Sequence, residues 1–122
     1  MPRPIHFELT AEDPDRASRF YADVFGWKFT RWDGPNEYWL AQTGEQGAHG
    51  IDGGLMRRAP GMNGTTNTID VPSIDEHVSK IERGGGSVIV PKMAVPGIGW
   101  MAYCQDTEGN MFGIMQLDEG AG

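Results

Sequence analysis

The 122-residue sequence is poor in the residues that build covalent cross-links and metal sites. It contains a single cysteine, Cys104, and three histidines. A lone cysteine cannot form an internal disulfide, and no second cysteine offers a zinc-binding or redox pair. We therefore interpret Cys104 as a small, buried strand residue.

Long apolar runs are also missing. No stretch approaches the roughly 20 apolar residues of a membrane span. The N-terminal segment, residues 1–6, lacks the apolar run of a secretory signal. We therefore expect a cytoplasmic protein with no membrane partner.

Positive charge is scarce. Ten Lys and Arg residues stand against 17 Asp and Glu residues, which gives a net charge of −7. The basic residues are scattered, and the negative charge repels the phosphates of nucleic acids and of anionic lipids. No nucleic-acid partner is therefore expected, whereas 39% hydrophobic and 22% charged residues are typical of one soluble globular domain.

The sequence contains one pattern twice. In the first copy, the alternation of residues 5–9 predicts a strand with His6 and Glu8 on one face. Asp13 and Pro14 then begin a helix that Gly26 ends. Three further strands are predicted over residues 27–32, 37–43 and 50–58, and the apolar face of the helix is predicted to consist of Ala17, Phe20, Tyr21 and Val24.

The second copy follows a turn-forming connector. A strand over residues 66–71 precedes a helix that Ser73 caps and that Gly84 or Gly85 ends. Ile74, Val78 and Ile81 form its apolar face. Three more strands are predicted over residues 87–91, 99–104 and 111–117, the last two joined by a hairpin loop over residues 106–110.

Corresponding residues of the two copies, such as Tyr21 and Ile81, lie 60 positions apart. The sequence thus predicts an α+β fold of two βαβββ modules related by a pseudo-twofold, with mixed sheets that curve around a shared cleft. Module one covers residues 1–58, a connector covers 59–64, module two covers 65–118, and 119–122 form a tail.

Five ordered segments carry a resemblance to a known family. They are residues 5–9, Asp13, residues 20–27, residues 84–86 and residues 106–110. In these five segments the chain resembles the vicinal oxygen chelate superfamily. That superfamily includes glyoxalases, extradiol dioxygenases, and fosfomycin and bleomycin resistance proteins. The resemblance specifies a fold but no single activity.

The resemblance also implies where a divalent metal would lie. Its ligand positions fall at His6, at Gly53 or Gly54, at Thr66 and at Gly113. Glycine has no side chain to coordinate a metal, and threonine is a poor ligand for zinc, nickel or iron. One imidazole does not hold a catalytic ion, so we expect no metal and no other cofactor.

Several polar side chains remain as candidate site residues. His6 and Glu8 are neighbours on one strand face and are candidates for general acid and base catalysis, although they are equally typical of a structural hydrogen-bonded pair. Thr66, Thr68 and Asp70 share a face that the pseudo-twofold would turn toward His6. They either bind a ligand or form a strand face that is exposed to water.

Large apolar side chains suggest a pocket around these groups. Trp39 and Trp100 lie on the third strand of each module, and Met111 and Met115 flank Gly113. Such residues suit an adaptable ligand pocket, but core packing is the alternative for each. The glycines of the implied metal positions either leave space for a ligand or mark β-bulges.

Three functions are open at this point. The first is a metal-free protein that binds a small and cationic apolar molecule, as in the bleomycin resistance branch. The second is a glyoxalase-like lyase or isomerase in which His6 and Glu8 transfer protons. The third is a structural or interaction role. The resemblance further implies a homodimer.

Overall fold

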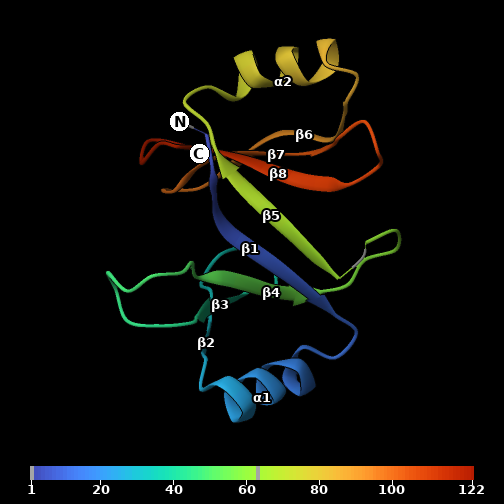
Figure 1. Ribbon diagram of the computed structural model, residues 1–122. Helices are drawn as coiled ribbons and strands as arrows, with labels where there is room; N and C mark the ends of the chain where they lie inside the picture. Colours follow the sequence, from blue (N-terminus) through green and yellow to red (C-terminus); the bar gives the residue numbers. More distant parts are fainter. Residues whose placement is uncertain (1, 63) are drawn as a thin grey trace. The chain divides into compact units, whose positions relative to one another are not determined.

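A computed structural model of the protein describes residues 2–62 and 64–122, and these contain two helices and eight strands (Figure 1). The predicted α+β fold of two βαβββ modules is confirmed. Among the described residues, no helix has the length and apolar character needed to cross a membrane. The elements are β1 (Pro4–Ala11), α1 (Pro14–Phe25), β2 (Lys28–Arg31), β3 (Trp39–Gln42), β4 (Gly53–Arg57), β5 (Thr65–Asp70), α2 (Ile74–Arg83), β6 (Ser87–Val95), β7 (Gly99–Gln105) and β8 (Met111–Leu117).

The chain folds into two compact units. One comprises His6–Thr66, and the other comprises Asn67–Gly122 together with residues 2–5. The divisions fall inside β1 and β5 and not at the connector 59–64. The reason is local pairing: the Asp70 amide donates to the carbonyl of Arg3 over 3.0 Å, which ties the start of the chain to the second module.

In the unit His6–Thr66, four strands lie in the order β2-β3-β4-β1, with β1 parallel to β4 and the other pairs antiparallel. Helix α1 begins as predicted, because the Asp13 side chain accepts the Arg16 amide at 3.1 Å and Pro14 fills the first turn. It ends as predicted at Gly26, which is left-handed with φ 77°.

The predicted apolar face of α1 is only partly correct. Phe20 and Val24 are each 55% exposed. A layer of rings explains this difference, because Tyr21 stacks on Trp27 at 4.9 Å and Trp27 packs against Phe7 at 5.7 Å. The helix therefore contacts the sheet through this aromatic layer and leaves its flank in solvent.

In the other unit, the strand order is β5-β8-β7-β6, with β5 parallel to β8 (Figure 1). Helix α2 covers one face of this sheet. Ser73 accepts the Glu76 amide at 3.2 Å, which confirms the predicted cap. The core contains Cys104, fully buried as predicted, and its other buried members are Val71, Ile74, Ala102 and Ile114.

Two segments of this unit differ from prediction. Strand β6 continues past Pro91 to Val95, because it is an edge strand whose register shifts twice between Val88 and Met93, and such places tolerate proline. The predicted tail is anchored: Ala121 is buried, and its carbonyl accepts the Gly97 amide at 3.1 Å.

Candidate functional site

The candidate site in the unit His6–Thr66 is built on the face of β1 that carries His6 and Glu8. Strand alternation puts both side chains on the face opposite Phe7, as predicted. Glu8 is buried and His6 half-buried. The parallel register pairs Glu8 with Gly54, so Gly54 lies on this face too.

A tyrosine that the sequence analysis did not single out completes this arrangement. The hydroxyl of Tyr38 lies 2.8 Å from His6 Nε2. It occupies the space into which a side chain at Gly54 would project. A glycine facing inward from a strand signals that a neighbour fills its space, but the sequence alone does not name the neighbour.

Of the two glycines proposed for the fourth-strand position, only Gly54 lies on the His6 face. A Cβ atom on Gly53 would instead meet the Phe7 ring at 2.6 Å, on the side of α1. The assignment to Gly53 is therefore corrected. The register supplies the reason, because Gly53 pairs with Phe7 and shares the orientation of that residue.

The electrostatics of this face centre on His6. Burial lowers the pKa of His6, and the negative charges of Glu8 and Asp52 oppose that shift. Because burial is the larger effect, His6 is neutral at neutral pH. A neutral imidazole can accept a proton at one ring nitrogen, and His6 Nε2 already shares a hydrogen bond with a phenol.

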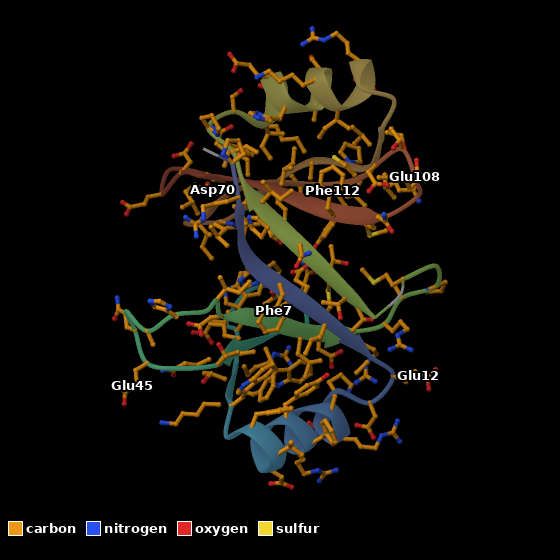
Figure 2. All side chains as sticks on the ribbon, viewed as in Figure 1. Phe7, Glu12, Glu45, Asp70, Glu108 and Phe112 are labelled. Atoms are coloured by element: carbon orange, nitrogen blue, oxygen red, sulfur yellow. The ribbon has the colours of Figure 1, made fainter. Side chains whose placement is uncertain are left out.

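The candidate residues of the other module lie on β5 and β8. The register pairs Thr68 with Gly113 and Asp70 with Met115. Figure 2 labels Asp70 at the end of β5. In the unit that contains β8, one sheet face therefore carries Thr68, Asp70, Met111, Gly113 and Met115. Thr66 is buried and belongs to the unit His6–Thr66.

This face is tightly filled around Gly113. A Cβ atom there would lie 3.1 Å from Met101 Cε and 3.3 Å from Thr68 Oγ1. Thr68 is only 1% exposed. Among the described residues, no hydrogen-bond partner of its hydroxyl is found.

The two tryptophans do not belong to these faces. Trp39 pairs with Leu55, which shares the α1 face of its sheet, and Arg31 lies over the Trp39 ring at 5.1 Å. Trp100 packs against the core beneath α2, with Nε1 donating to Asp118 Oδ2 at 3.1 Å. Each strand therefore turns its tryptophan to the helix side, away from His6 and Thr68. Their role as ligand-binding residues stays a prediction.

The metal that the family resemblance implies does not fit these residues. At Gly54 the ligand position is filled by the hydroxyl of Tyr38, and at Gly113 Met101 and Thr68 would crowd a side chain. Within residues 2–62 and 64–122, no three His, Cys, Asp or Glu side chains gather as metal ligands would. The arrangement at His6 offers hydrogen bonds and proton transfer.

Comparisons with known proteins agree with this architecture. Residues 3–44 match a family model described as the N-terminal part of bleomycin resistance protein-like proteins. Over 98% of its length the chain is 28% identical to CFP32 of Mycobacterium tuberculosis, whose name provisionally assigns it as a glyoxylase. The chain spans only about half of that relative, covering 47% of it.

Two solved structures share the fold. Methylmalonyl-CoA epimerase from Mycobacterium tuberculosis has a TM-score of 0.67 and 13% identity, over 92% of this chain and 85% of that one. A protein from Vibrio splendidus, described as a glyoxalase/bleomycin resistance protein/dioxygenase superfamily member, has a TM-score of 0.64 and 18% identity, over 94% and 98%.

Proposed function

We propose that the chain is a member of the vicinal oxygen chelate superfamily and that it binds a small organic molecule on the His6 face without the divalent metal of that superfamily. In this proposal His6, Tyr38 and Glu8 supply the polar contacts. The apolar body of the ligand contacts Leu40, which lies on the same face as Gly54 and is 45% exposed.

One observation carries the proposal. The Tyr38 hydroxyl occupies the space of a side chain at Gly54 and hydrogen-bonds His6 at 2.8 Å. A metal-ligand position has thus been replaced by a phenol joined to the one remaining ligand. A phenol and a neutral imidazole are suited to hydrogen-bond an organic ligand.

The charges of this face favour a ligand with an amine. Glu8 and Asp52 both raise the pKa of His6 by their negative charge, which means that they create a negative potential at the imidazole. A cationic or hydrogen-donating group is stabilised by that potential, whereas a carboxylate is repelled. The net charge of −7 acts in the same direction at longer range.

The binding experiment compares two faces of the same sheet. We would titrate the protein with metal-free bleomycin and with smaller aromatic amines, by calorimetry. Tyr38→Phe keeps the ring and removes the hydroxyl, so we expect an affinity loss of about tenfold, equal to one good hydrogen bond. Trp39→Phe on the opposite face is the matched control and should bind as the unaltered protein does.

Metal dependence tests the same proposal independently. Dialysis against EDTA should leave ligand affinity and melting temperature unchanged, and added Ni²⁺, Mn²⁺ or Zn²⁺ should not raise the melting temperature. Stoichiometric transition metal in protein purified without an affinity tag would contradict the proposal. So would a panel of amines in which no member binds.

A second candidate function is a lyase or isomerase acting on a small carbonyl compound. The observation in its favour is the lowered pKa of His6, which keeps the imidazole unprotonated and able to act as a base at neutral pH. His6 would take the proton from the carbon beside the carbonyl, while the Tyr38 hydroxyl donates a hydrogen bond to the enolate oxygen.

This activity would be detected as exchange of the substrate α-proton with deuterium from solvent. We expect His6→Ala to abolish exchange and Trp39→Phe to leave it unchanged. Candidate substrates are 2-substituted acyl thioesters, the class to which the methylmalonyl-CoA in the name of the structurally similar epimerase belongs. If the unaltered protein catalyses no exchange with any of these substrates, the catalytic function is ruled out and only the binding function is left.

A further inference from the structure

A hollow lies on the other side of the sheet from His6. It has a volume of about 590 Å³ and lies within the unit His6–Thr66, between α1 and the end of β1. Leu9 and Leu55 line it, and the register places both on the α1 face. Figure 2 labels Glu12, on its rim, where β1 leads into α1.

The walls of this hollow are partly apolar and partly polar. Ala11, Ala17, Phe20 and Tyr21 line it beside the two leucines. Phe20 is 55% exposed, and Pro14 is the only buried residue among the described positions of α1. The volume is in the range of small-molecule sites, and the ring of Phe20 is exposed to solvent. Both features favour a ligand with an apolar body.

Two guanidinium groups are among the polar groups that line the hollow. Arg58 is fixed in place, because its Nε donates to Thr10 Oγ1 at 3.2 Å and its Nη2 donates to the Thr10 carbonyl at 3.0 Å. Arg16 comes from the first turns of α1. In the part of the chain that the structure describes, neither guanidinium forms an ion pair, whereas the neighbouring Arg57 is paired with Glu37.

Two unpaired arginines beside an apolar wall select an anion. These two guanidiniums are distinguished by their place, because both line one hollow and Thr10 holds Arg58 there. Guanidinium groups bind carboxylate and phosphate groups with good geometry. Glu12 and Asp13 also lie on the rim, and their charges disfavour a dianionic phosphate more than a monoanionic carboxylate.

We propose that this hollow is a binding site for an organic monocarboxylate, with the carboxylate between Arg16 and Arg58 and an apolar tail against Phe20 and Leu9. The site is separate from the His6 face, which carries the opposite electrostatic preference. One chain therefore has two sites, one for amines and one for carboxylates, on opposite faces of a sheet.

The test uses sodium decanoate as the probe and its neutral analogue 1-decanol for comparison. Chemical shifts of the ¹⁵N-labelled chain, followed during titration at submicellar concentration, should move in residues 9–21 and around Arg58. We expect Arg16→Gln and Arg58→Gln each to weaken decanoate binding by about tenfold, and decanol to bind at least tenfold more weakly than decanoate.

The matched control is Arg19→Gln, which removes an exposed arginine from the same helix outside the hollow and should leave decanoate affinity unchanged. Arg16 is itself exposed, so its variant tests the proposal even if Arg58→Gln does not fold. His6→Ala should bind decanoate normally, which separates this site from the proposed function above.

Three results would overturn the proposal. They are equal affinity of decanoate and decanol, unchanged decanoate affinity in both arginine variants, and no shift changes at millimolar decanoate. Tighter binding of decyl phosphate than of decanoate would overturn the assignment to a carboxylate and identify a phosphate site instead.

Discussion

At the scale of single residues, Thr68 is the clearest imperfection of the fold. Its hydroxyl is buried and, among the described residues, has no hydrogen-bond partner. A buried hydroxyl without a partner costs its desolvation energy and gains nothing in return. We expect Thr68→Val to raise the free energy of unfolding by about 1 kcal/mol, measured by urea denaturation.

The control for this substitution is Thr30→Val, which makes the same change at an exposed position of β2. It should alter the free energy of unfolding by less than about 0.5 kcal/mol. Destabilisation by Thr68→Val would contradict the prediction and indicate that an ordered water satisfies the hydroxyl.

His6 gives a prediction about pH. Burial lowers its pKa in the folded protein, so the unfolded chain binds a proton at a higher pH than the folded chain does. The stabilisation from neutral His6 is therefore complete above its ordinary pKa of 6.5 and is lost as the pH falls from there toward the lowered folded value.

Urea denaturation at pH 7.5 and pH 5.5 checks this expectation. The unaltered protein should lose stability between the two values, and His6→Gln, which cannot titrate, should lose less. Equal losses in the two proteins would show that other groups account for the acid sensitivity. The control His49→Gln changes an exposed histidine and should behave as the unaltered protein.

Sequence reasoning found part of the site at this scale. Alternation along β1 placed His6 beside Glu8 correctly, because strand period is a local property. It did not find Tyr38, because the contact with Gly54 depends on how β3 pairs with β4, which is not local. The orientation of Trp39 and Trp100 was not predictable for the same reason, because an aromatic side chain suits a layer packed against a helix as well as it suits a ligand pocket.

At the scale of elements, helix α2 depends on its first turn. Ser73 accepts the amide of Glu76 at 3.2 Å and leads directly into the buried Ile74. Loss of such a cap typically costs about 1 kcal/mol. We expect Ser73→Ala to lower the free energy of unfolding by that amount, measured from the urea midpoint at constant slope.

The matched control lies on the same helix. Ser79 is exposed within α2, where alanine has the higher helix propensity, so Ser79→Ala should be neutral or slightly stabilising. Equal effects of the two substitutions would contradict a specific role for the cap.

Most element boundaries follow from local chemistry, and the sequence therefore predicts them well. Asp13 and Gly26 delimit α1, and Asp106 stabilises the hairpin loop before β8 because its carboxylate accepts the amides of Glu108 and Asn110. The side-chain amide of Asn110, which donates to Asp106 Oδ2 at 3.0 Å, is the largest cause that lowers the pKa of Asp106, and these backbone hydrogen bonds add to it. Strand β6 was predicted too short because Pro91 is tolerated only through a bulge on an edge strand.

At the scale of the whole molecule, the repeat in the sequence corresponds to a repeat in strand register. Glu8 pairs with Gly54 in one unit, and Thr68 pairs with Gly113 in the other. Both modules therefore have glycine at corresponding positions, each close to a side chain of a neighbouring residue. The division of the chain was less predictable, because nothing local indicates that β1 begins in one unit and ends in the other.

The last prediction concerns association of whole chains. The superfamily resemblance implies a homodimer, and we propose that this chain forms one. Each copy carries a net charge of −7, so two copies repel each other at low ionic strength. Salt shortens the range of this repulsion, from roughly 30 Å at 0.01 M to about 3 Å at 1 M, and leaves apolar contacts intact.

We therefore expect dimerisation to tighten as salt is added, which is the opposite of an interface held by ion pairs. Sedimentation equilibrium at micromolar concentration should give twice the chain mass of 13.4 kDa, with a dissociation constant that falls between 0.02 M and 0.5 M NaCl. A single species of 13.4 kDa at both salt concentrations would rule out the dimer. A dissociation constant that rises with salt would instead mean that charges of opposite sign meet at the interface, so that local complementarity outweighs the net charge.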